Sequence, residues 1–89
     1  MLFLAGEVDL SHVTTLRNTA VEALDATPRR LVLDVSAVTF LDSAILGVLI
    51  RIHHAAEERG IRFTLRRPSP LVQRLLRLTG LEELIPIEG

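Results

Sequence analysis

The chain has 89 residues, a net charge of −1, 48% hydrophobic residues and no cysteine. This length and hydrophobic content predict one domain with one core, without disulfides or thiolate metal sites, in agreement with a reducing cytoplasm. The nearly balanced charge excludes a global attraction to nucleic acid or to a membrane surface. The start of the chain, MLFLAGEVD, lacks the pattern of a secretory signal, and the longest uncharged run, residues 43–50, is too short to span a bilayer.

The first half of the chain alternates between strand and helix patterns. The apolar residues 2–5 predict a short strand that ends at Gly6. Residues 11–26 carry hydrophobic side chains at three- and four-residue steps, which predict a helix that Pro28 stops. The continuous apolar run LVLDV at 31–35 favours a strand that is covered on both faces.

The second half continues the alternation. Residues 43–59 predict a second helix closed by a glycine, and residues 61–65 alternate with period two, as a strand does. A third helix over 71–78 follows two prolines, and 84–87 predicts a last short strand. Strands separated by helices indicate an α/β domain with a mixed or mainly parallel sheet of about four strands, packed with three to four helices.

The second predicted helix has one narrow polar stripe and a broad apolar arc. At about 100° per residue, the stripe that faces solvent consists of Gly47, Arg51, His54 and Glu58. The arc is wider than one contact with a sheet requires, and its residues are Ile45, Leu46, Val48, Leu49, Ile50 and Ile52. It is explained either by burial between the sheet and a neighbouring helix or by a partner protein that covers part of it.

Asp42 and Ser43 stand directly before this helix and leave three roles open for Ser43. Serine is a favoured N-cap, and capping does not exclude a second role. A nucleophile would need a base, but the G-x-S-x-G elbow is absent, His53 and His54 lie about 15 Å along the same helix, and His12 could approach Ser43 only by accident of folding. The third role is phosphorylation. A phosphate adds about −1.5 to −2 charges, which the free N–H groups of a helix start tolerate while a docked carboxylate is repelled.

Metal and nucleic-acid sites are not predicted. The adjacent side chains of His53 and His54 diverge by about 100° on a helix, which makes them a poor metal chelate. Seven arginines against two acids lie between residues 51 and 77, but Phe63 is the only aromatic residue among them. A solvated basic face explains this pattern better than a nucleic-acid site does. No cofactor is expected.

Three motifs resemble those of STAS domains in the family of anti-sigma factor antagonists. The stretch LVLDVSAVTFLDSAILGVL at 31–49 is similar to the core motif of the family, in which Asp-Ser opens a helix. GEVD at 6–9 is similar to its G-x-x-D turn, and SPLVQRLLRLTGLEELIPI at 69–87 to its C-terminal segment. The resemblance implies one STAS domain over 1–89 that lacks the usual first strand, so that a sheet edge is exposed or the domain comes from a longer protein.

The resemblance also implies a cytoplasmic partner-switching protein that is not an enzyme. In the family, an anti-sigma factor that is itself a serine kinase phosphorylates the serine after the aspartate, and a phosphatase restores it. The unphosphorylated form binds the kinase, which releases the sigma factor. Carried over, Ser43 is the expected phosphorylation site, with Asp9 near it at the kinase-facing surface. The expected partner-binding residues are Asp9, Asp42, Ser43, Ala44, Ile45 and Val48.

The sequence departs from the family pattern at Ile45, where members commonly have glycine. A β-branched residue there is expected to place bulk beside Ser43. This departure favours an alternative function, in which the domain is a non-phosphorylated STAS scaffold or accessory subunit of a transporter or sensor complex. Direct insertion into the membrane is expected in neither case.

Overall fold

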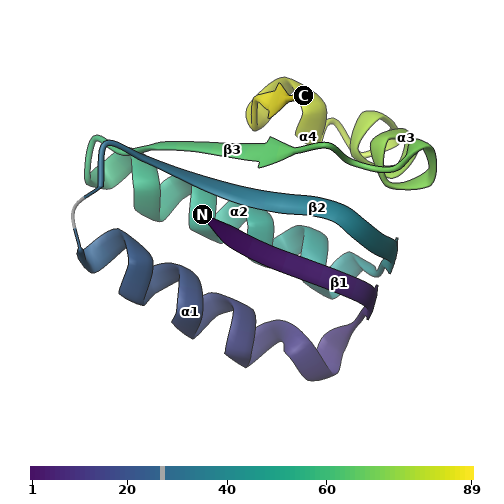
Figure 1. Cartoon of the computed structure of the whole chain (residues 1–89), viewed down its shortest axis with the longest axis horizontal. Helices are drawn as coiled ribbons and strands as arrows, with labels where there is room; N and C mark the ends of the chain where they lie inside the picture. Colours follow the sequence, from purple (N-terminus) through teal and green to yellow (C-terminus); the bar gives the residue numbers. More distant parts are fainter. Residues whose placement is uncertain (27) are drawn as a thin grey trace.

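A four-stranded sheet forms the centre of the computed structural model, which describes residues 1–26 and 28–89 (Figure 1). The strands are β1 (Leu2–Val8), β2 (Arg30–Leu41), β3 (Arg62–Arg66) and β4 (Ile87–Glu88). They lie in the order β1-β2-β3-β4, and each neighbouring pair is parallel. Parallel neighbours need a crossover connection rather than a tight turn, and the intervening helices provide it. The predicted α/β class with a mainly parallel sheet of about four strands is confirmed.

The helices supply the rest of a single core. They are the 3-10 turn η1 (Leu10–His12), α1 (Val13–Asp25), α2 (Ser43–Glu58), α3 (Pro70–Leu78) and α4 (Leu81–Leu84). α1 and α2 pack against each other, and the buried side chains of both join those of the strands, α3 and α4 in one cluster. In the described part of the chain, none of these helices combines the length and the apolar character needed to cross a membrane.

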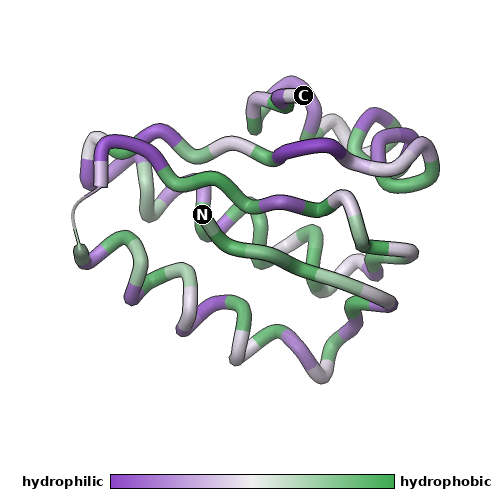
Figure 2. Tube along the Cα trace, in the orientation of Figure 1, coloured by the Kyte–Doolittle hydropathy of each residue, from purple (hydrophilic) through white to green (hydrophobic). Residues whose placement is uncertain are grey.

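The apolar arc of α2 is explained by burial. Its inward side chains are less than 4% exposed and belong to the core: Ile45, Val48, Leu49, Ile52 and Ala56. Leu46 and Ile50 are partly buried and pack against the same cluster. In Figure 2 the hydrophobic stretches of α2 and of the neighbouring strands are coloured green. Three residues of the predicted solvent stripe, Arg51, His54 and Glu58, are exposed, whereas the fourth, Gly47, is half-buried.

Two strands are longer than the sequence pattern predicted. β1 does not end at Gly6. This glycine adopts φ 77°, and the pairing with β2 shifts register beside it before the strand continues to Val8. β2 does not end at residue 35 but continues to Leu41, because its second half pairs with the end of β1. Pairing with a neighbouring strand is a tertiary effect, so a local apolar run did not reveal it.

Smaller differences occur in two helical regions. The helix predicted for residues 11–26 is divided into η1 and α1, because Asp9 caps a separate 3-10 turn. The strand predicted for 84–87 is shorter, since Leu84 belongs to α4 and β4 contains only Ile87 and Glu88.

The burial of α2 leads to a test of the core. We expect Leu49→Ala to lower the free energy of unfolding by about 2–5 kcal/mol, because Leu49 is 1% exposed and its truncation leaves a cavity. Leu78→Ala is the matched control, since Leu78 is 73% exposed, and its effect should stay within about 0.5 kcal/mol. Urea unfolding of both variants measures the difference. Equal effects would contradict the burial of α2.

Candidate functional site

The carboxyl ends of β1 and β2 bring two separate parts of the sequence together. Val8 pairs with Leu41, so the residues that follow each strand, Asp9 and Asp42, leave the sheet at the same edge. The backbone N–H of Asp42 donates to the Val8 carbonyl at 3.3 Å, which fixes this proximity. Figure 1 shows that β1 and β2 end side by side, and that α2 starts at this edge.

Asp42, not Ser43, is the N-cap of α2. Its backbone is extended, and its Oδ1 atom accepts a hydrogen bond from the Ile45 N–H at 3.0 Å. Ser43 is therefore the first residue of the helix itself. The prediction that the Ser43 hydroxyl caps the helix is wrong because aspartate is an equally good cap and stands one residue earlier, where the chain is still extended.

The second carboxylate oxygen of Asp42 binds the start of η1. Its Oδ2 atom accepts a hydrogen bond from the Leu10 N–H at 3.0 Å, across 32 positions of sequence. Asp42 thus satisfies a backbone donor at the start of η1 and one at the start of α2. These two helical starts are held together by one side chain.

Asp9 caps η1 and carries a stabilised negative charge. Its Oδ1 atom accepts hydrogen bonds from the Ser11 hydroxyl at 2.6 Å and the Ser11 N–H at 2.9 Å. These bonds lower the pKa of Asp9 below its ordinary value, with a smaller contribution from His12. The edge therefore presents the carboxylate of Asp9 beside that of Asp42.

Asp9, Ser11 and His12 contain the residue types of a catalytic triad but not its geometry. The Ser11 hydroxyl donates its proton to Asp9, and His12 Nδ1 lies 3.2 Å from the same oxygen of Asp9. In a triad, by contrast, the histidine stands between the serine and the acid and uses a different ring nitrogen for each. The arrangement is a helix cap that stabilises a charge.

Ser43 is exposed at this edge, and Ala44 is half-buried beside it. Because Asp42 provides the cap, the Ser43 hydroxyl is not required for this role. Ile45 and Val48, which were predicted to bind a partner, do not lie on the surface. They are 0% and 1% exposed and point into the core. The prediction that the β-branched side chain of Ile45 places bulk beside Ser43 is wrong for the same reason.

Two hydrophobic residues at the edge were missed by the sequence interpretation. Leu10 in η1 is 71% exposed, and Phe40 near the end of β2 is 46% exposed. A contiguous exposed hydrophobic patch with a polar rim is typical of a protein-binding surface, whereas single exposed hydrophobic residues are common on any surface. Phe40 could have been found only by recognising that β2 extends beyond residue 35. We define the docking surface as Asp9, Leu10, Phe40, Asp42, Ser43 and Ala44.

The family is established by comparison with known proteins. Residues 1–86 match the family described as Mlab, STAS domain. The chain belongs to the STAS domain family. A STAS-domain-containing protein of Pseudomonas aeruginosa is 35% identical over 68 residues, which cover 76% of this chain and 67% of that protein.

Solved structures of STAS proteins share the fold. A candidate anti-sigma factor antagonist of Thermotoga maritima superimposes with a TM-score of 0.87 at 26% identity, covering 98% of this chain and 77% of its own. An anti-sigma factor antagonist of Mycobacterium paratuberculosis gives 0.80 at 30% identity, covering 98% and 74%. A sulfate transporter family protein of Wolinella succinogenes gives 0.85 at 18% identity, covering 97% and 72%, which shows likeness of fold alone. STAS structures related to this chain thus include anti-sigma factor antagonists.

The double role of Asp42 is testable. We expect Asp42→Ala to lower the free energy of unfolding by about 1–3 kcal/mol, because it leaves the N–H groups of Ile45 and Leu10 without their acceptor. Asp42→Asn should recover part of this loss at most, since its NH2 group faces one of the two donors. Glu22→Ala on the exposed face of α1 is the control. Urea denaturation that gives Asp42→Ala the stability of this control would contradict the double cap.

The charge at Asp9 is testable by titration. A lowered folded-state pKa means that Asp9 contributes stability above its ordinary pKa of 3.8, and that this contribution is lost as the pH falls through the folded-state value. Ser11→Ala removes the main donor and should raise the pKa of Asp9, measured by NMR of its side-chain carboxyl carbon. Ser36→Ala is the control, because Ser36 makes the equivalent hydrogen bonds to Asp34. It should raise the pKa of Asp34 and leave that of Asp9 unchanged.

Proposed function

We propose that this chain is an anti-sigma factor antagonist that acts by partner switching in the cytoplasm. Its unphosphorylated form binds an anti-sigma factor that is a serine kinase, and phosphorylation of Ser43 releases it until a phosphatase restores the hydroxyl. The observation that carries this proposal is the exposed Ser43 at the first position of α2, beside a cap that does not use its hydroxyl. It is a binding protein in this proposal, and the chemistry belongs to its partners.

The local geometry supports a phosphorylated state that stays folded. Ser43 lies in the first turn of α2, where N–H groups without helical partners and the helix dipole favour an added negative charge. The cap bonds from Ile45 and Leu10 go to the Asp42 side chain and do not need the Ser43 hydroxyl. The phosphate therefore adds charge without removing an existing hydrogen bond of the cap.

The composition of the docking surface supports a large effect on a partner. Leu10 and Phe40 offer hydrophobic contact, while Asp9 and Asp42 already make the rim negative. A phosphate adds about −1.5 to −2 charges to this rim. A carboxylate of the partner that docks 4 Å from this phosphate is repelled by about 4 kcal/mol for each pair of unit charges at an effective dielectric constant of 20. That repulsion corresponds to nearly a thousandfold in affinity, and it exceeds the roughly 1 kcal/mol of a helix cap.

The position of Ile45 is compatible with access by a kinase. Its side chain is 0% exposed and packs in the core, and only its backbone N–H takes part in the cap. The substitution of the glycine that is common in the family therefore adds volume inside the molecule, away from the Ser43 hydroxyl.

Substitutions at Ser43 test the proposal. We expect Ser43→Ala to bind the anti-sigma factor kinase of the same organism as the unchanged chain does, and Ser43→Asp to bind at least about a hundredfold more weakly because of charge repulsion. Asn18→Asp, which adds a charge on the exposed face of α1, is the control and should keep full affinity. Isothermal titration calorimetry measures all four. Equal affinities of Ser43→Ala and Ser43→Asp would contradict the switch.

A second candidate function is a STAS scaffold in a transporter or sensor complex that uses the same docking surface without phosphorylation. It is suggested by the shared fold of the sulfate transporter family protein of Wolinella succinogenes, whereas the departure at Ile45 does not decide between the two candidates because that side chain is buried. Intact-mass measurement after incubation with the kinase and ATP distinguishes the two candidates. One added phosphate that is absent in Ser43→Ala supports the antagonist. No added phosphate, together with co-purification of a membrane ATPase, supports the scaffold.

A further inference from the structure

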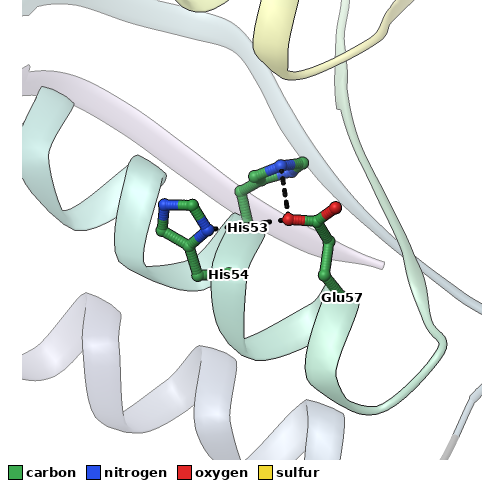
Figure 3. A group of neighbouring side chains, drawn as sticks. All are labelled: His53, His54 and Glu57. Atoms are coloured by element: carbon green, nitrogen blue, oxygen red, sulfur yellow. Dashed lines mark ion pairs between the residues drawn. The ribbon is translucent and has the colours of Figure 1, made fainter.

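Three potential metal ligands meet on one turn near the carboxyl end of α2. His53 and His54 are adjacent, and Glu57 follows four and three residues later, on the same side of the helix. Figure 3 shows the imidazole rings of both histidines directed toward one carboxylate oxygen of Glu57. The expectation that adjacent histidines diverge too far was incomplete, because it considered the direction of the Cα–Cβ bonds and not the third ligand between the rings.

The distances between the donor atoms are close to those within a metal coordination shell. His53 Nε2 lies 3.1 Å and His54 Nδ1 3.6 Å from Glu57 Oε1. Ligands about 2.0–2.2 Å from a tetrahedral zinc ion are about 3.3–3.6 Å apart. One donor atom from each residue lies within 4.8 Å of the other two. The distances from Glu57 to His53 and to His54 are therefore within about 0.2 Å of those between ligands of a tetrahedral zinc ion.

The cluster combines an anchored ligand with two accessible ones. The side chain of His53 is 14% exposed, so its position is restrained by the surrounding protein, whereas those of His54 and Glu57 are 61% and 62% exposed. Arg59, two residues after Glu57, is bound elsewhere, to the Ala55 carbonyl and to Asp25. Within residues 1–26 and 28–89, the ion pairs of Glu57 are those with the two histidines.

The electrostatics of α2 also favour a cation here. The last turn of α2 contains no basic residue and ends with Glu57 and Glu58, and the C-cap residue Arg59 places one cation at this end through its bond to the Ala55 carbonyl. Negative side chains at a helix carboxyl end oppose the helix dipole, whereas a cation there is stabilised by it. A bound divalent ion would neutralise Glu57 and place positive charge at the negative end of the helix.

We propose that His53, His54 and Glu57 form a binding site for a divalent transition metal ion of the zinc class. Two imidazoles and one carboxylate suit Zn²⁺, Ni²⁺ or Cu²⁺, whereas Mg²⁺ and Ca²⁺ prefer oxygen ligands alone. Three protein ligands leave a fourth coordination position for water. The site lies about ten residues, or roughly 15 Å, along α2 from Ser43 and is separate from the docking surface.

Titration of untagged protein with ZnCl2 tests the site. We expect one Zn²⁺ ion per chain by calorimetry and a rise of Tm with Zn²⁺ concentration, because the ion binds the folded state. MgCl2 should produce neither. Glu57→Gln and His54→Gln should each weaken Zn²⁺ binding by about tenfold or more. Mutation of residues that only hydrogen-bond to metal ligands typically lowers affinity by about 10–100-fold, and loss of a ligand itself should cost at least as much.

Matched controls separate this site from general surface binding. Glu58→Gln removes the neighbouring carboxylate, and His12→Gln removes a histidine elsewhere, so both should keep the affinity of the unchanged chain. Circular dichroism establishes that each variant is folded, and the exposure of His54 and Glu57 makes their substitution compatible with folding. The proposal is overturned if stoichiometric Zn²⁺ is not bound, or if Glu57→Gln and His54→Gln bind it as tightly as the two controls.

Discussion

The side chain of Asp42 joins the starts of two successive helical connections, η1 after β1 and α2 after β2. Its two oxygens accept hydrogen bonds from Leu10 in η1 and Ile45 in α2, while its backbone N–H donates to Val8 at the end of β1. Helix starts expose N–H groups that must find acceptors, and here one carboxylate serves two of them. The exposed arrangement of Asp9, Leu10 and Ser43 depends on these three bonds, because they fix where η1 and α2 begin relative to the sheet.

This arrangement separates the structural task from the proposed regulatory one. If Ser43 were the cap, its phosphorylation would remove a bond that holds α2 in place, and the modified chain would lose stability and partner together. Because Asp42 is the cap, modification of the neighbouring hydroxyl changes the charge of the surface and leaves the cap bonds in place. The proposed switch requires both the unphosphorylated and the phosphorylated chain to stay folded. Asp42 as the cap and Ser43 as the adjacent hydroxyl are compatible with this requirement.

Much of the fold was predictable because it depends on local patterns. The apolar spacing in α2 and the run at the start of β2 gave the element types, and their alternation gave a mainly parallel sheet. The end of β2 was not predictable in this way, since residues 36–41 are strand only through pairing with β1. Ile45 points inward because it follows the same helical spacing as Leu49 and Ile52. The sequence interpretation placed it at the surface instead, because the family commonly has glycine at this position.

The site itself was only partly predictable. Asp9 and Asp42 could be associated through the family motifs, and the strand ends bring them to one edge. The choice between Asp42 and Ser43 as cap could not be made from sequence, because both residue types favour that position and only the backbone conformation distinguishes them. Leu10 and Phe40 were missed because an exposed hydrophobic side chain is recognised only when burial is known.

The helix dipole makes the two ends of α2 favour bound groups of opposite charge. The amino end, at Ser43, favours an anion, and the carboxyl end, where Glu57 and Glu58 lie, favours a cation. Phosphate at the first and a metal ion at the second would each be stabilised by the helix, and the interaction between them would be weak, because a separation of roughly 15 Å exceeds the Debye length of about 8 Å at physiological salt. A metal ion at His53, His54 and Glu57 is therefore expected to stabilise α2 without altering the charge that a partner meets at Ser43. The two sites can be occupied independently, and coupling between them would require a change in the helix itself.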